Sequence, residues 1–296
     1  YHLEYPPELA GRGWPTTVIG KTYRKDSKAR NAFEGMRAMW ETPLRLGDVV
    51  TIAEPLAYLS ELKLMVQSPI AEDFTLEDLL KDVLHESTPE QTEKLESYMR
   101  KAAAGLAAFH QSGARHGSTV ELEDRFPEIR ELTGRLAAFD LSLGDAAMPL
   151  LARIEEYAHE HPAGEPVPTH GTFNPEQVLI SQGRIGFIDF DDFCMAEPAM
   201  DVGLFCSAIR DTGMNIGCDA FLASRDARIA RHQRLDALCN LFVDEYAAHA
   251  PLSRERVLLW QSLDFLRNCL HYWIKVKPAE PDTPMLVLEQ LLGSMS

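Results

Sequence analysis

Three carboxylates stand within four residues, at Asp189, Asp191 and Asp192, directly after the apolar run from Ile185 to Ile188. Carboxylates this close repel one another unless water or a cation neutralises them, and the nearest basic residue in the sequence is Arg184. Hard oxygen ligands of this kind suit Mg²⁺. Because a strand-like run leads into the cluster, the pattern favours a metal site, with a solvated acidic turn as the alternative.

A polar loop precedes this cluster in the sequence. The segment THGTFNPEQ at 169–177 contains a histidine, an asparagine and a glutamine, and it leads into a short apolar strand. A turn at 181–183 and a second apolar strand follow, and the second strand ends at Asp189. The pattern predicts a β-hairpin-like insert that carries the candidate chemistry.

The charge of the chain restricts its partners. Its 296 residues include 29 Lys and Arg against 45 Asp and Glu, a net charge of −16. Residues 151–200 hold two basic and nine acidic side chains, so this window favours metal ions and cationic substrates, although a solvated acidic surface has the same composition. The acidity argues against a nucleic-acid binder and against a basic membrane-surface protein, because both need clustered Lys and Arg.

Membrane and secreted classes are also disfavoured. The longest apolar candidate, 257–276, is interrupted by charged and polar residues, and it does not resemble the ~20-residue apolar stretch of a spanning helix. The N-terminus lacks the hydrophobic core of a signal peptide, and the five cysteines form no CxxC pair. We therefore expect a cytoplasmic protein.

Two structural units are expected from the secondary-structure signals. Residues 1–69 form a small β-rich unit with one amphipathic helix, predicted from strands at 16–24, 49–59 and 62–68 and a helix at 28–41. Residues 70–296 are mainly helical around the hairpin-like insert, with helices predicted from 75, over 88–110, 121–141 and 145–160, and from 198 onward, including 254–276. The fold class is therefore α+β with two lobes, and ligands usually bind in the cleft between lobes. Aromatic residues of the last helix, Trp260 among them, are expected to pack mainly in the core.

The order of several short motifs resembles the aminoglycoside phosphotransferase and choline kinase group, which are relatives of protein kinases. The resemblance implies a protein-kinase-like fold with a nucleotide-binding N-lobe, and it runs through most of the chain. The matching pieces are the Lys21 strand VIGKTYR, the helix end LAAFH at 106–110, His170-Gly171-Thr172 for the family's HGD, Gln177 for its Asn, Ile188-Asp189-Phe190-Asp191 for its metal motif, and Glu197-Pro198-Ala199-Met200-Asp201 for its (D/E)PAxDL segment.

This resemblance implies a role for each matching residue. Lys21 anchors the nucleotide and pairs with Glu34, while Gln67 lies in the hinge whose backbone meets adenine. Asp189, Gln177 and Asp191 are the implied metal ligands. Position 172 is that of the catalytic base, and His170 and Asp201 support the catalytic loop.

Three departures indicate a divergent member with a degenerate catalytic loop. Thr172 stands where the family has Asp, and a threonine hydroxyl cannot act as a base near pH 7. Gln177 keeps the amide oxygen of the family's Asn but is one methylene longer. No GxGxxG-type turn precedes the Lys21 strand, so we expect the first lobe to be truncated at its start.

Three functions compete at this point. The leading hypothesis is an ATP- and Mg²⁺-dependent phosphotransferase that moves the γ-phosphoryl group to a hydroxyl of a small molecule, either a cationic aminoglycoside or amino alcohol or a sugar. The alternative is a pseudokinase, a nucleotide-binding or scaffolding module that has lost transfer activity with its catalytic Asp. A third reading takes Asp189-Phe190-Asp191 as the DxD motif of a glycosyltransferase, but no other feature of the sequence supports it.

Overall fold

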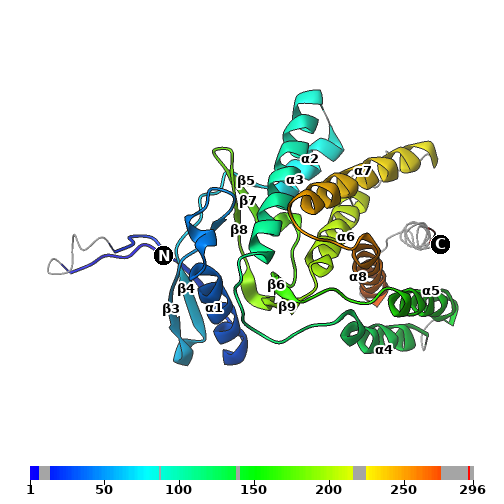
Figure 1. Ribbon diagram of the computed structural model, residues 1–296, viewed down its shortest axis with the longest axis horizontal. Coiled ribbons are helices and arrows are strands. Elements are labelled where there is room, and N and C mark those ends of the chain that lie inside the picture. Colours follow the sequence, from blue (N-terminus) through cyan, green and yellow to red (C-terminus); the bar gives the residue numbers. More distant parts are fainter. Residues whose placement is uncertain (7–13, 87, 138–140, 216–224, 275–292, 294–296) are drawn as a thin grey trace.

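A small lobe of sheet and helix lies beside a larger helical lobe in this computed structural model (Figure 1), which describes residues 1–6, 14–86, 88–137, 141–215, 225–274 and 293. The small lobe has an antiparallel sheet in the order β1-β4-β3. Its elements are β1 (Ile19–Thr22), α1 (Asp26–Trp40), β3 (Pro55–Leu59) and β4 (Leu64–Gln67). Helix α1 buries small and methionine side chains at helical spacing, which provides the apolar face that packs on this sheet.

A second sheet connects the two parts of the chain. Its order is β2-β8-β7-β5, with β2 (Thr51–Ile52), β5 (Phe74–Thr75), β7 (Val178–Ser181) and β8 (Arg184–Phe187). Strands β7 and β8 form the expected hairpin, and its turn residues Gln182 and Gly183 both have positive φ, as a tight hairpin turn requires. Strand β2 pairs in parallel with β8, so the early chain contributes a strand directly beside the candidate chemistry.

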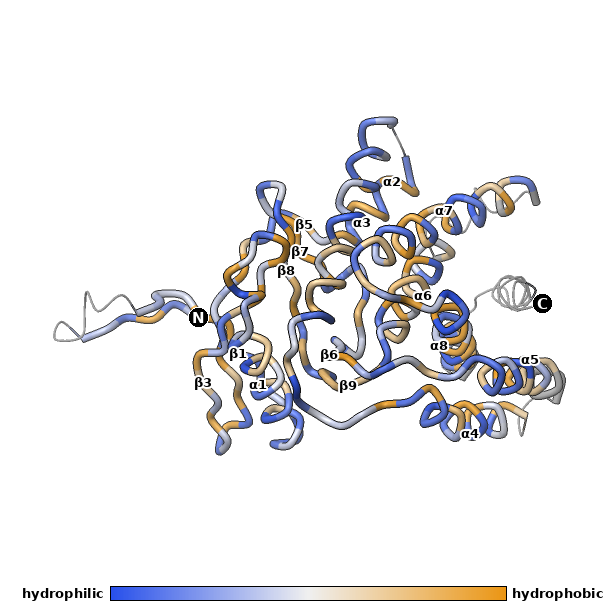
Figure 2. Tube along the Cα trace, in the orientation of Figure 1, coloured by the Kyte–Doolittle hydropathy of each residue, from blue (hydrophilic) through white to orange (hydrophobic). Residues whose placement is uncertain are grey.

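Seven helices of the described chain build the larger lobe, together with a short two-stranded sheet of β6 (Val167–Thr169) and β9 (Cys194–Ala196). Hydrophobic and hydrophilic residues alternate along these helices (Figure 2), as expected where each helix buries one face. The helices are α2 (Leu76–His85), α3 (Pro89–His110), α4 (Phe126–Ala137), α5 (Leu141–Glu160), α6 (Ala199–Asn215), α7 (Arg225–His249) and α8 (Arg254–Ile274).

Most element predictions are confirmed, and the differences have local causes. Capping boxes at Thr75 and Thr88 begin α2 and α3, and Ser253 caps α8 by accepting a hydrogen bond from the Arg256 amide. The helix predicted over 121–141 begins later, as α4, because residues 122–125 form a 3₁₀ turn. The strand predicted over 49–59 divides into β2 and β3, because β2 pairs with β8 rather than with β4.

The core lies where the two sheets meet the helices. Phe109, Phe173, Phe187 and Phe190 are fully buried there and their rings contact one another in pairs, so the hairpin and the polar loop are held against α3. None of the described helices is both long and apolar enough to span a bilayer. The division of the chain between residues 69 and 70 stays a prediction.

Candidate active site

The acidic cluster lies at the end of β8 and faces the small lobe. Asp189 adopts the left-handed conformation, with φ of 70°, so the chain turns sharply as the strand ends. Lys21 on β1 reaches across, and its Nζ lies 2.5 Å from Asp189 Oδ1 and 2.8 Å from Asp191 Oδ2. The structure therefore brings together the predicted nucleotide-anchoring lysine and two of the predicted metal ligands.

These ion pairs shift the acidities of their members. Partial burial opposes ionisation of Asp189, but the hydrogen bond and the charge of Lys21 outweigh it and hold the pKa of Asp189 below its ordinary value. Burial also opposes the charge on Lys21, yet the two carboxylates keep the pKa of Lys21 above its ordinary value. Both partners are therefore charged near neutral pH.

Tyr23 is a member of this cluster that the sequence did not reveal. Its hydroxyl donates a hydrogen bond of 2.7 Å to Asp191 Oδ1. Burial and the neighbouring carboxylate raise the pKa of Tyr23 well above its ordinary value, so the phenol stays protonated and keeps donating. The only available signal was the position of Tyr23 two residues after Lys21, which puts both side chains on one face of an extended segment.

The expected pairing of Lys21 with Glu34 is not found. Among the ion pairs of the described residues Lys21 contacts Asp189 and Asp191, and none joins it to Glu34, which lies partly buried on α1. The Lys21 ammonium group instead forms ion pairs with the carboxylates of Asp189 and Asp191 at the end of β8. Gln67 ends β4, where the next residue, Ser68, is bound by backbone and side chain to Glu54. The hinge role of Gln67 stays a prediction.

Asp201 holds the loop that precedes the hairpin. It is fully buried at the first turn of α6, and its carboxylate accepts hydrogen bonds from the backbone amides of His170 (2.6 Å) and Gly171 (2.9 Å). His110, at the end of α3, contacts the same carboxylate at 3.0 Å and Tyr246 at 2.7 Å. Burial would raise the pKa of Asp201, but the hydrogen bonds and charge of the histidines hold it below its ordinary value. The role of Asp201 as a support of the catalytic loop stays a prediction.

Two further contacts fix the conformation of this loop. The His170 ring nitrogen Nε2 lies 2.8 Å from the carbonyl oxygen of Ile188, next to Asp189. Gly171 has φ of +89°, and a Cβ there would lie 2.0 Å from the carbonyl oxygen of Asp192. Only glycine fits this crossing, so the loop and the acidic turn are packed in direct contact.

The residues present fit a Mg²⁺ ion of the kind that kinases use. The amide oxygen of Gln177 is buried and has no hydrogen-bond partner, while its amide nitrogen lies 3.4 Å from the Thr172 hydroxyl. The Gln177 backbone carbonyl accepts a hydrogen bond from the amide of Ile188, so Gln177 adjoins the strand end that leads into Asp189. No cluster of three or more His, Cys, Asp or Glu side chains suited to a metal occurs in the part of the chain that the structure describes. Mg²⁺ in kinase sites relies on phosphate and water oxygens beside one or two protein groups, so one carboxylate and one free amide oxygen suffice.

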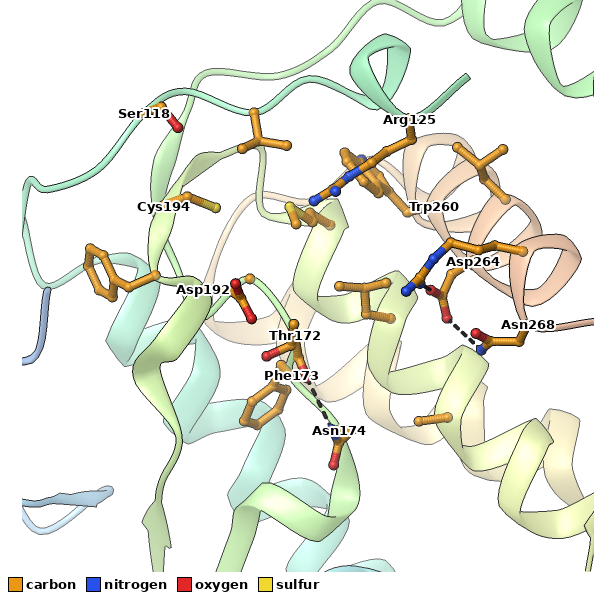
Figure 3. A pocket seen from close by; sticks show the side chains of 18 of the residues that line it. Ser118, Arg125, Thr172, Phe173, Asn174, Asp192, Cys194, Trp260, Asp264 and Asn268 are labelled. Atoms are coloured by element: carbon orange, nitrogen blue, oxygen red, sulfur yellow. Dashed lines mark hydrogen bonds and ion pairs between the residues drawn. The ribbon is translucent and has the colours of Figure 1, made fainter. Parts of the chain in front are cut away.

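A cavity of about 590 Å³ is lined by residues 171–174 of the loop (Figure 3), and Lys21 is not among its lining residues. Exposed Thr172 lies in its wall together with Asp192, whereas the neighbouring acidic residues Asp191 and Glu176 are not among the lining residues. Trp260, expected mainly in the core, also contributes to this wall. The polar and charged lining side chains are Asn31, Ser118, Arg125, Thr172, Asn174, Asp192, Asp264, Arg267 and Asn268.

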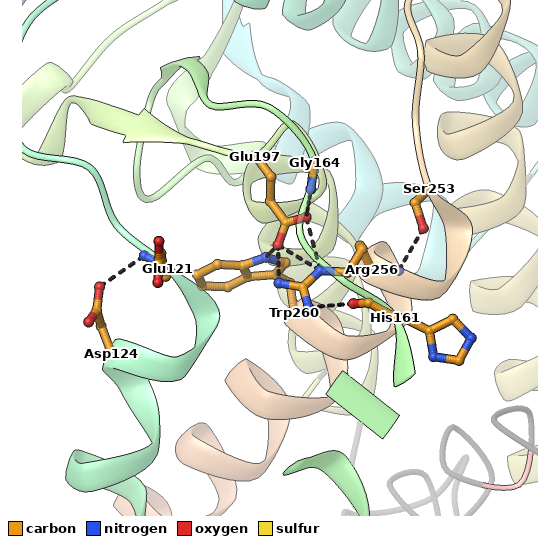
Figure 4. Close-up of polar contacts among 8 residues, drawn as sticks. All are labelled: Glu121, Asp124, His161, Gly164, Glu197, Ser253, Arg256 and Trp260. Carbon is orange, nitrogen blue, oxygen red and sulfur yellow. Dashed lines mark hydrogen bonds and ion pairs between the residues drawn. The ribbon is translucent and has the colours of Figure 1, made fainter. Parts of the chain in front are cut away.

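A buried ion pair supports the far wall of the cavity (Figure 4). Glu197, which precedes α6, contacts Arg256 of α8 at 2.5 Å and accepts a hydrogen bond of 2.7 Å from the Trp260 indole. Arg256 also donates to the His161 carbonyl at the end of α5. These contacts fix α5, α6 and α8 relative to one another and hold Trp260 in place.

Comparisons with known proteins agree with this geometry. The model of the phosphotransferase enzyme family matches residues 13–252. A glucosamine kinase in complex with glucosamine, ADP and inorganic phosphate has a TM-score of 0.67 at 17% identity, covering 94% of this chain and 77% of its own. Choline kinase LicA from Streptococcus pneumoniae has a TM-score of 0.57 at 15% identity, with 94% of this chain and 86% of its own covered. No curated protein sequence matches the chain. The structural likenesses confirm the predicted two-lobed, protein-kinase-like fold.

Proposed function

The chain belongs to the phosphotransferase enzyme family, and on that premise we propose that it transfers the γ-phosphoryl group of ATP to a hydroxyl of a small molecule in a Mg²⁺-dependent reaction. The observation that carries the proposal is the position of Asp189. Its carboxylate contacts Lys21 of the small lobe, while the carbonyl of the preceding residue, Ile188, contacts His170 of the catalytic-type loop, whose residues 171–174 line the cavity. Nucleotide phosphates on one side of this loop and an acceptor on the other would meet beside Thr172.

Each residue of the cluster has a role in this reaction. Asp189 and the free amide oxygen of Gln177 would hold Mg²⁺, which when bound neutralises phosphate charge. Asp191 and Tyr23 keep the Lys21 ammonium group in position, and this group is the cation available for a phosphate oxygen. Phosphoryl transfer depends mostly on positioning and charge neutralisation, so these contacts supply the larger part of catalysis.

The acceptor proton needs a destination other than Thr172. Asp192 is the carboxylate that lines the cavity in direct packing contact with the loop, since its backbone crosses Gly171. We assign it the role of accepting the hydroxyl proton. General-base assistance is typically worth ~10²–10⁴-fold in rate, so the reaction would be slowed, not abolished, by the absence of Asp at 172.

The acceptor itself is a small hydroxyl compound. A cavity of about 590 Å³ suits a sugar-sized or amino-alcohol-sized molecule. Structural relatives carry glucosamine kinase and choline kinase activity in their names, and both acceptors bear a hydroxyl group. Because the phosphoryl donor is ATP, we expect the protein to work in the cytoplasm.

The first test separates nucleotide binding from transfer. Calorimetric titration of ATP with and without Mg²⁺ should show magnesium-dependent binding to the wild type that is lost in Asp189→Ala. The absence of Mg²⁺-dependent ATP binding in the wild type would overturn the proposal.

The second test concerns the missing base. Thr172→Asp should raise the rate of acceptor-dependent ADP formation, by less than the ~10²–10⁴-fold of a full general base because Asp192 already accepts the proton, whereas the matched variant Thr172→Asn, which has the shape of Asp without its basicity, should not raise it. The protein would be a pseudokinase if the wild type binds Mg²⁺ and ATP but only the Thr172→Asp variant forms ADP with an acceptor. Loss of wild-type activity in Asp192→Asn, restored by adding Thr172→Asp, would support the role of Asp192.

A further inference from the structure

One of the charged side chains in the cavity wall has no ion-pair partner among the described residues. Four charged side chains line it: Arg125, Asp192, Asp264 and Arg267. Arg267 contacts Asp264 at 2.8 Å, and the other carboxylate oxygen of Asp264 accepts from Asn268. Asp192 lies 3.6 Å from the ammonium group of Lys28. Both carboxylates are therefore compensated by cations other than Arg125.

Arg125 is the side chain left without a counter-charge. It ends the 3₁₀ turn Leu122–Arg125 that precedes α4 and is partly buried. No ion pair or hydrogen bond recorded for the described residues involves its guanidinium group. In Figure 3 the side chain extends into the cavity beside Trp260, across from Thr172 and Asn174. The charged group thus points at the space in which an acceptor would lie.

The surroundings make this charge effective. Arg125 is partly buried and shares the cavity wall with apolar residues, among them Val120, Ile129 and Leu263, and such surroundings reduce the screening of its charge. Arginine keeps its charge at all relevant pH values and presents a planar pair of donors that matches carboxylate and phosphate oxygens. A partly desolvated arginine of this kind is stabilised when an anion binds to it.

The acidic character of the chain does not extend to this wall. Of the nine acidic residues in 151–200, Asp192 is the one that lines the cavity. Asp189 and Asp191 contact Lys21 and are not among the residues that line the cavity. The net acidity that favoured a cationic acceptor in the sequence therefore lies elsewhere.

We propose that the acceptor carries an anionic group, a carboxylate or a phosphate, that binds Arg125 while its hydroxyl lies beside Thr172 and Asp192. The substrate class is then hydroxy acids or phosphorylated alcohols. The inference rests on the proposed function in one respect only, that the cavity is the acceptor site.

The test uses pairs of hydroxyl compounds that differ in the anionic group. The pairs are serine with ethanolamine, glycerate with glycerol, gluconate with sorbitol, and glycerol 3-phosphate with glycerol. The last pair tests a phosphate and the first three test a carboxylate. Binding is measured by calorimetry with a non-hydrolysable ATP analogue and Mg²⁺, and ADP formation is measured separately with ATP. In at least one pair the anionic member should bind about 10- to 100-fold more tightly to the wild type, the range of a charge-assisted hydrogen bond.

Arg125→Met should remove this preference, and Arg125→Lys, which keeps the charge without the planar fork, should retain part of it. Arg130→Met is the matched control, because Arg130 lies five residues away on α4 and pairs with Glu155 outside the cavity. Thermal unfolding and ATP binding of all variants check that the fold is intact. Equal binding within every pair, or a preference that survives in Arg125→Met, would overturn the inference.

The two proposals fail in different ways. Arg125-dependent binding of an anionic compound without any ADP formation would reject phosphoryl transfer and leave the anion site standing. ADP formation with neutral or cationic acceptors alone would leave the phosphotransferase standing and reject the anion site.

Discussion

Two ion pairs in this protein have the same length and opposite surroundings. Lys21 and Asp189 approach to 2.5 Å with 38% and 40% of their side chains exposed, whereas Arg256 and Glu197 approach to 2.5 Å with 1% and 4% exposed. Water screens the first pair and can replace either partner, so its contribution to stability is small. The second pair has lost its water, and each charge depends on the other.

The difference separates the residues proposed to bind phosphates and Mg²⁺ from the residues that support the site structurally, which we call the frame. The exposed pair can open when phosphates and Mg²⁺ enter, because the alternative partners are also charged. The buried pair fixes helices α5, α6 and α8 and Trp260 of the cavity wall, and among the described residues neither charge has a second ion-pair partner. Similar distances between charged atoms therefore do not imply similar roles, and four predictions test this distinction.

The largest effect is expected for Arg256→Ala, which leaves the Glu197 carboxylate buried and unpaired. We expect a loss of about 3–5 kcal/mol in the free energy of unfolding, measured by chemical denaturation. Arg254→Ala is the matched control, two residues away on the same helix, because Arg254 pairs with Asp244 at the surface. It should change stability by less than about 1 kcal/mol. Equal losses in the two variants would show that burial does not distinguish these pairs.

Asp189→Ala should have the opposite profile. The change removes the proposed metal ligand, so activity should fall by ~10²–10³-fold or more, the range seen when one electrostatic contact to a transition state is lost. Stability should change by less than about 1 kcal/mol, because the side chain is well exposed and the like-charged Asp191 and Asp192 lie nearby. Steady-state kinetics and denaturation on the same samples check both numbers. A large loss of stability would place Asp189 in the frame.

The pH dependence of stability should identify Asp201 as part of the frame. Its pKa is lowered in the folded protein, so its contribution is complete above the unfolded value near 4 and is lost as pH falls toward the folded pKa. Asp201→Asn should cost about 1.5–3 kcal/mol at pH 7, and the gap between variant and wild type should narrow below pH 4. Denaturation at pH 7 and at pH 3.5 measures the gap, and a constant gap would contradict the assignment.

Tyr23→Phe is expected to give the smallest effect. It removes one hydrogen bond to Asp191, worth about 0.5–1.5 kcal/mol. The Lys21–Asp189 pair remains, so the KM for ATP should rise by less than about tenfold while the stability hardly changes. Tyr5→Phe, which loses a hydrogen bond to Pro15 at the surface, serves as the control. A Tyr23 variant without activity would mean that the phenol does more than hold a carboxylate.

The sequence predicted the parts of the site that lie within one continuous segment. The loop from His170, the hairpin and the strand end at Asp189 all lie within twenty residues, where turn signals and apolar runs are informative. Tyr23, Glu197 and Arg125 were missed as functional or supporting residues, because their meaning depends on partners far along the chain. Glu197 and Arg256, for example, are separated by 59 residues. The expected Lys21–Glu34 pair is not found in the structure, where Lys21 contacts Asp189, 168 residues later in the chain.

The parallel pairing of β2 with β8 has a consequence for biosynthesis. Thr51 and Ile52 leave the ribosome long before their partners Gly186 and Phe187. Until the hairpin has been translated, β2 lacks its neighbour in the sheet and Lys21 lacks the carboxylates of Asp189 and Asp191, and exposed strand edges are sites of aggregation. The first lobe is therefore completed after much of the second has been made. Newly made chains should become protease-resistant only once the IDFDD turn has emerged.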